Sequence, residues 1–158
     1  MPVYQIIFLE NNVALVDAEL LRTFNSFEDH PDPDVYGLYD HYETVIGIGA
    51  VIVQRFLVSV HKGNRETLTI GPIHFGGKSY VQLVNSCANY WKHKDEWNMK
   101  NLAKNARNTI ATLESVGVSI QSDYPLSNCM HCILGENSAV QFSKYLPYLE
   151  EWSNVVAQ

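Results

Sequence analysis

The sequence predicts a single all-α domain over residues 1–158, a bundle of about five helices around a long central helix at residues 35–61. A length of 158 residues is typical of one domain and is sufficient to bury a core. The composition, with 46% hydrophobic and 18% charged residues, indicates a globular chain rather than a disordered or fibrous one. Apolar residues also recur every three or four positions over most of the chain, which is the pattern of amphipathic helices joined by short connections.

The N-terminal block ends at a proline-rich turn. Its first residues, 3–9, are mostly apolar and fit either a short buried strand or the first turns of a helix. From Val13 onwards the apolar spacing is helical. Pro31 and Pro33 then end this helix, because neither can continue the hydrogen-bond ladder, and Asp34 is the expected N-cap of the next helix.

The segment 35–61 carries the longest helical pattern in the sequence. Additional apolar residues such as Ile48 and Ile52 widen its stripe, so this helix is expected to be central and buried on more than one side. Gly47 and Gly49 each cost a helix about 1 kcal/mol relative to alanine. Their expected role is to allow a neighbouring helix to approach closely.

The C-terminal half is predicted to contain an irregular segment followed by three helices. Residues 64–77 read as an ordered loop or a small hairpin, with the alternation at 67–70 suggesting a short strand. Amphipathic patterns then predict helices at 79–97, at 98–116 and from about Ser138 to the C-terminal region.

The formal net charge of −6 is unevenly distributed along the sequence. The stretch from Arg55 to Arg107 holds nine basic and three acidic residues, a net charge of +6, and the remainder of the chain has a net charge of −12. The simplest interpretation is that each block is a solvated face. Alternatively, the middle segments approach an anion such as RNA, and the acidic flanks meet a basic protein partner.

The sequence offers no sign of secretion, membrane insertion or a bound cofactor. Three cysteines do not form a disulfide framework and suit a reducing compartment. The N-terminus lacks the basic region of a secretion signal, and no window reaches the roughly 18 consecutive apolar residues of a membrane span. Glycine-rich phosphate loops and the GxSxG elbow are also missing. A cytoplasmic protein that needs no cofactor and has no membrane partner is therefore expected.

The polar face of the predicted 79–97 helix is the most informative chemical feature. Asn85, Asn89, His93 and Glu96 follow one another at helical spacing and should line one stripe. A histidine there could act as a general acid or base, and the adjacent lysines could hold a phosphodiester. The plainer alternative is a solvated face on which His93 and Glu96 form a pair.

The run from Asn85 to Trp97 resembles the signature helix of HEPN-type proteins. That family comprises small α-helical bundles of toxin–antitoxin, abortive-infection and phage-defence systems, and many members are dimeric, metal-independent endoribonucleases. Their active motif is an arginine followed after four to six residues by a histidine. Arg55 and His61 match this spacing, whereas the resembling helix lacks the arginine and has Asn89 upstream of His93 at a shorter interval.

The resemblance implies a homodimer that cleaves RNA. His61 or His93 would then activate the ribose 2′-hydroxyl or protonate the leaving oxygen. Arg55, or Lys92 and Lys94, would stabilise the charge of the transition state. Asn89 completes the candidate catalytic set. The residues expected to bind RNA share a positive charge in the middle block: Lys92, Lys94, Lys100, Lys104 and Arg107. The alternative is a non-catalytic helical interaction or dimerisation module that keeps the fold without the chemistry.

Cys129 and Cys132 form a CxxC motif, which raises a second alternative, a zinc-stabilised regulatory domain. Zinc needs four ligands, and the remaining two would have to be Cys87 and either His131 or His74. No second CxxC exists, so free intracellular thiols are the favoured interpretation and no metal site is assigned.

Overall fold

The computed structural model describes residues 3–134 and 137–157, and over these residues the fold is an all-α bundle, as predicted. Its α-helices, with their bounds, are α1 (Val3–Asp29), α2 (Leu38–His61), α3 (Tyr80–His93), α4 (Lys104–Glu114), α5 (Pro125–Leu134) and α6 (Leu146–Val156). Three short 3-10 helices accompany them: η1 (Arg65–Thr69), η2 (Lys94–Glu96) and η3 (Phe142–Tyr145).

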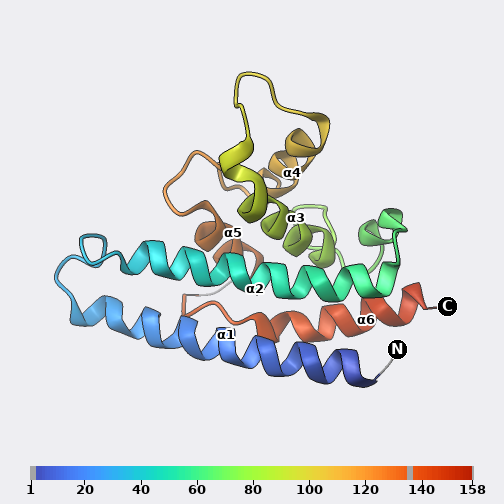
Figure 1. Ribbon diagram of the computed structural model, residues 1–158, viewed down its shortest axis with the longest axis horizontal. Helices are drawn as coiled ribbons and strands as arrows, with labels where there is room; N and C mark the ends of the chain where they lie inside the picture. The colour runs from blue at the N-terminus through green and yellow to red at the C-terminus, as the bar shows by residue number, and fades with distance from the viewer. Residues whose placement is uncertain (1–2, 135–136, 158) are drawn as a thin grey trace.

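The helices are arranged around α2. Figure 1 shows α1, α2 and α6 running along the long axis of the molecule, with α3, α4 and α5 stacked on one side of α2. α2 packs against α1 and α3, and it also contacts α5 and α6. The buried residues of these helices form one continuous core, so the prediction of a central helix is confirmed.

Several predicted boundaries were wrong at the helix starts. Residues 3–9 begin α1 rather than a strand, which settles the open alternative. The central helix begins at Leu38, not at residue 35, and its N-cap is Gly37 in a left-handed conformation (φ 67°) rather than Asp34. Asp34 instead accepts a hydrogen bond from the hydroxyl of Tyr124.

The C-terminal half also departs from the predicted pattern. Residues 67–70 are not a strand, since they belong largely to η1. An isolated bridge joins Ile73 in this segment to Ser79, just beyond it. The 98–116 prediction shortens to α4, which leaves Lys100 in a loop. The CxxC motif lies within α5, a helix that the spacing pattern did not predict and that begins at Pro125.

Two carboxylates hold distant helix starts in place. Glu43 on α2 is buried and accepts hydrogen bonds from the backbone N–H groups of Leu126 and Ser127, at 2.8 and 2.7 Å, where α5 begins. The Ser127 hydroxyl donates a third bond at 2.6 Å. Asp17 on α1 accepts from the N–H groups of Phe142 and Ser143 at the start of η3. Both carboxylates satisfy N-terminal N–H groups that no intrahelical carbonyl can reach.

The central helix is long and apolar enough to cross a membrane, judged by length and composition alone. However, 56% of its most apolar stretch is buried inside the fold. The core helix of a helical bundle can have the same length and composition, so these two properties do not indicate where the protein is located.

Candidate functional site

An amide cluster joins the middle of α2 to α3. The side chain of Gln54 donates hydrogen bonds to the side-chain oxygens of Asn85, at 2.9 Å, and Asn89, at 2.8 Å. Gln54 is buried and both asparagines are half-buried. The candidate catalytic residue Asn89 therefore has a helix-packing role in this structure, with its amide oxygen directed at α2.

His93 and Glu96 form the pair that their spacing predicts. His93 Nδ1 lies 3.1 Å from Glu96 Oε2, and both side chains are exposed. One ring nitrogen is thus held by a carboxylate while the other is left for solvent or a ligand. Lys92 is exposed beside this pair, so the end of α3 carries both an imidazole ring and positive charge.

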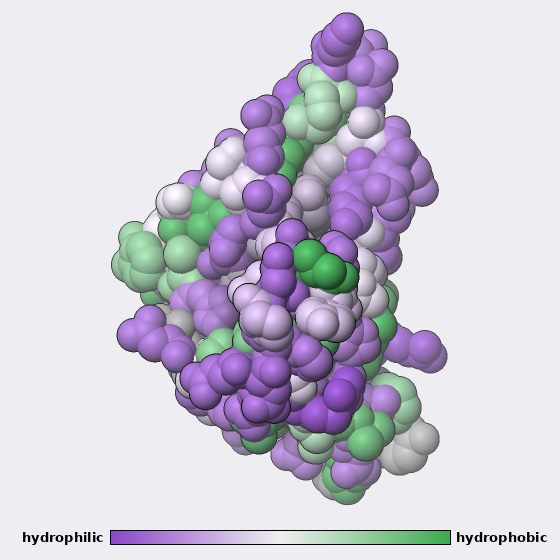
Figure 2. Space-filling view, turned by 90° about the vertical axis from the view of Figure 1, so that its left-hand side faces the viewer, coloured by the Kyte–Doolittle hydropathy of each residue, from purple (hydrophilic) through white to green (hydrophobic). Residues whose placement is uncertain are grey.

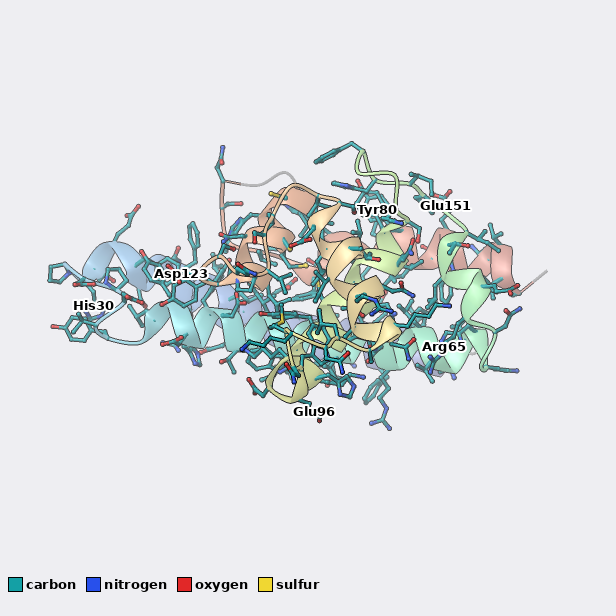
Figure 3. The ribbon with its side chains drawn as sticks, turned by 90° about the horizontal axis from the view of Figure 1, so that it is seen from above. His30, Arg65, Tyr80, Glu96, Asp123 and Glu151 are labelled. Carbon is teal, nitrogen blue, oxygen red and sulfur yellow. The ribbon has the colours of Figure 1, made fainter. Side chains whose placement is uncertain are left out.

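The candidate histidines lie at opposite ends of the α2–α3 pair. The two helices are antiparallel, because Trp91 packs on Gly47 whereas Asn89 meets Gln54. His61 lies seven residues from Gln54 towards one end of the helix pair, and His93 lies four residues from Asn89 towards the other end. At 1.5 Å per residue, the two histidines are therefore about 16 Å apart along the helices. Figure 3 shows Glu96, which is bonded to His93, and Arg65, which follows α2, at different places in the molecule.

His61 and Arg55 occupy two further environments. His61 is buried, and its Nδ1 accepts a hydrogen bond of 3.0 Å from the N–H of Gly63 at the end of α2. Arg55 is exposed and lines a hollow of about 360 Å³ between α1 and α2. The four candidate catalytic residues therefore do not converge on one site within this chain.

A larger hollow lies between α2 and the end of α3. This α2–α3 groove has a volume of about 660 Å³, and its lining residues are Ile48, Val51, Ile52, Trp91, Lys92, Lys94 and Asp95. Ile48 is 47% exposed on the central helix, while Val51, Ile52 and Trp91 are half-buried. The helix is buried on more than one side, as predicted, but Ile48, one of the residues expected to widen its buried stripe, is exposed on this face.

The rim of the α2–α3 groove is basic. The ammonium group of Lys94 lies 4.4 Å from the centre of the Trp91 ring, a cation–π contact that fixes its charge over the groove. In the part of the chain that the structure describes, no carboxylate forms an ion pair with Lys92 or Lys94, and Asp95 is the one acidic lining residue. A ligand thus meets apolar side chains on the floor and positive charge at the edge.

The remaining RNA-binding candidates lie beyond the groove. Lys100 is in the loop after η2, and Lys104 and Arg107 are exposed on α4. The guanidinium of Arg107 donates a 2.9 Å hydrogen bond to the carbonyl of Leu102. Together with Lys92 and Lys94 they give the α3–α4 end of the molecule, at the top of Figure 1, a basic character.

The sequence is acidic at the α1–α2 turn, where Glu28, Asp29, Asp32 and Asp34 lie at the end of α1 and in the segment that follows it. Figure 3 labels His30 and Asp123 there, and Figure 2 looks onto this end and shows mainly hydrophilic atoms with a few hydrophobic groups among them. Hydrogen bonds from Arg22 and His41 lower the pKa of Glu19 to about 2.

Cysteines and histidines do not gather into a metal site in residues 3–134 and 137–157, where no three His, Cys, Asp or Glu side chains are close enough to hold an ion. Cys87 and Cys129 are buried and Cys132 is half-buried. Burial raises the pKa of the Cys129 thiol to about 12, which keeps it protonated and poorly suited to ligation. His74 Nδ1 accepts from the N–H of Gly76 instead.

We predict a pH-dependent loss of stability through His74. The ring is buried between Phe75, Tyr80 and the backbone of Cys132 and Ile133, and this burial lowers its pKa from 6.5. Below about pH 6.5 the unfolded chain therefore binds more protons than the folded chain does. The free energy of unfolding is highest above that pH and decreases as the pH falls towards the lowered pKa.

Urea unfolding at about pH 7.5 and about pH 5.5 measures this loss. The wild type should lose more unfolding free energy between the two conditions than His74→Gln does. His131, whose pKa burial also lowers, remains in both proteins and cancels in the comparison. If both proteins lose the same unfolding free energy, protonation of His74 does not cause the pH dependence.

The residues that sequence reasoning missed are Gln54 and the exposed apolar face of α2. Gln54 sits in a run of apolar residues and has no local partner, because Asn85 and Asn89 lie more than 30 positions away. Apolar residues around the whole circumference of a helix do signal that each face needs a partner. They do not say whether that partner belongs to the same chain.

Comparisons with known proteins give no match: no protein-family model, curated protein or solved structure is similar to this chain. The HEPN resemblance of residues 85–97 accordingly stays a prediction from the sequence.

Proposed function

We propose that this chain is a helical interaction module that binds a partner protein in the α2–α3 groove. The observation that carries the proposal is the partly exposed apolar face of α2, on which Ile48 is 47% exposed beside the half-buried Trp91. An apolar floor with a polar edge is the usual composition of a protein-binding surface. Trp91 is a suitable anchor, because tryptophan is enriched among the residues that dominate binding energy.

The separation of the candidate catalytic residues also favours binding over catalysis. General acid–base chemistry needs its groups within hydrogen-bond reach of one substrate, whereas His61 and His93 lie about 16 Å apart along the helices. Arg55 lines a different hollow from Lys92 and Lys94. An interaction module does not need these residues to converge.

Site-specific photo-crosslinking tests this function. A benzoylphenylalanine at position 48, in the groove, should crosslink a protein that mass spectrometry identifies. The same residue at position 155 is the control, because Val155 is helical and similarly exposed (45%) but lies on α6, outside the groove. A crosslink to a second copy of the chain would make the module a homodimer. Absence of any product at position 48, or the same product at both positions, would contradict the proposal.

A second candidate function, a metal-independent endoribonuclease of HEPN type, is favoured by the His93–Glu96 pair beside Lys92. In that case RNA cleavage should be lost in His93→Gln. It should persist in His61→Gln, because the buried His61 ring is held by the N–H of Gly63. Gel analysis of a digested single-stranded RNA measures both variants. An RNA left intact by the wild type would exclude this candidate.

A further inference from the structure

We infer that the occupant of the α2–α3 groove is an acidic amphipathic α-helix of about three turns, supplied by the partner protein. This inference rests on the proposed function and adds the chemistry, length and secondary structure of the partner segment. It follows from the shape of the exposed face, its length along α2 and the charges that surround it.

The exposed face of α2 is continuous across two hollows. Ile52 lines both the α2–α3 groove and the hollow between α1 and α2, so the two meet at this side chain. The lining residues of α2 extend from Ile48 to Ser59, which is about 16 Å at 1.5 Å per residue. A partner helix of about eleven residues matches that length.

A helix fits this face better than an extended peptide does. Within residues 3–134 and 137–157 the structure has one isolated bridge and no strand, so no sheet edge is available for strand addition. Helices instead bind in hydrophobic grooves through apolar anchors at positions i, i+3, i+4 and i+7. Ile48, Val51, Ile52 and Arg55 present this same spacing on α2.

The charges around the face select an acidic partner. Across both hollows the lining residues include three cations, Arg55, Lys92 and Lys94, and one anion, Asp95. This local excess of positive charge stands out in a chain whose formal net charge is −6. Complementary charges at a rim act mainly on partner choice and association rate, and salt weakens them.

Two synthetic helical peptides of fourteen residues test the inference. Both carry leucine at positions i, i+3, i+4, i+7 and i+11, and their remaining positions are rich in glutamate in one peptide and in lysine in the other. Fluorescence anisotropy of the labelled peptides measures their affinity for the full chain at low and high salt. The acidic peptide should bind at least about tenfold more tightly than the basic one, and less so at high salt.

Paired charge reversals localise the effect. Lys92→Glu with Lys94→Glu should reverse the preference, whereas Lys100→Glu with Lys104→Glu makes the same change in net charge outside the groove and should preserve it. Ile48→Glu should weaken binding of the acidic peptide and Val155→Glu should not. Circular dichroism confirms that each variant is folded.

The outcomes separate this inference from the proposed function. Equal affinity for the two peptides, or the same loss in both double variants, overturns the acidic helix. A third outcome also overturns it: neither peptide binds, single-stranded RNA binds tightly, and the Lys92→Glu, Lys94→Glu double variant no longer binds that RNA. If the partner protein is crosslinked to position 48 through a basic or non-helical segment, the acidic helix is overturned but the proposed interaction module is supported.

Discussion

Replacement of Glu43 by alanine should lower the free energy of unfolding by about 3 kcal/mol. The carboxylate is buried and accepts three hydrogen bonds at the start of α5, two from backbone N–H groups and one from the Ser127 hydroxyl. Hydrogen bonds to a charged group each contribute about 1.5–3 kcal/mol, and donors left unpaired in the interior add a penalty. Part of this loss is offset because alanine also removes the cost of burying a charge.

Asp40→Ala is the matched control for Glu43→Ala. Asp40 lies one turn earlier on α2 and is exposed, so its removal should cost less than about 1 kcal/mol, the contribution of an acidic residue to the helix dipole. Urea unfolding of both variants gives the comparison, and hydrogen exchange of α5 should be faster in Glu43→Ala. Similar stability losses in the two variants would show that the bonds to α5 contribute little.

Gly49→Val should also destabilise the fold by about 3 kcal/mol. A Cβ atom at this position would clash with Cε2 of Phe142, whose side chain is completely buried. Any residue with a side chain therefore forces α2 and η3 apart. Replacing a helical glycine gains at most about 1 kcal/mol in helix propensity, the value for alanine, and the destabilisation from overpacking exceeds that gain.

Two further variants isolate the steric cause. Ile48→Val places the same side chain one position earlier, at an exposed site, and should change stability by less than about 0.5 kcal/mol. Phe142→Leu in the Gly49→Val background should recover part of the loss, because it shortens the side chain that the new Cβ meets. Strictly additive effects in this double-mutant cycle would contradict a direct contact between positions 49 and 142.

The sequence predicted the helical fold because that information is local. Apolar spacing identified the central helix, and Pro31 and Pro33 marked the break after α1. The glycines at 47 and 49 were also interpreted correctly as points of close approach, although side chains of Trp91 and Phe142 make the contact rather than a helix backbone.

The features that were missed depend on partners distant in sequence. Glu43 and Leu126 are 83 positions apart, and no periodicity links a carboxylate to a helix start so far away. Asn89 was assigned to catalysis because it shares a stripe with His93, but its amide oxygen accepts a hydrogen bond from Gln54. The α2–α3 groove was missed for a related reason, since a spacing pattern cannot show that one apolar face of a helix lacks a partner within the chain.

Chemical-shift mapping of the complex tests the central claim, that the α2–α3 groove is the binding surface. Isotope-labelled chain would be titrated with the partner segment that crosslinks at position 48. The account predicts shifts concentrated at residues 48–59 of α2 and residues 91–95 at the end of α3. Shifts confined to the acidic α1–α2 turn, the loop at 70–78 or α6 would contradict it.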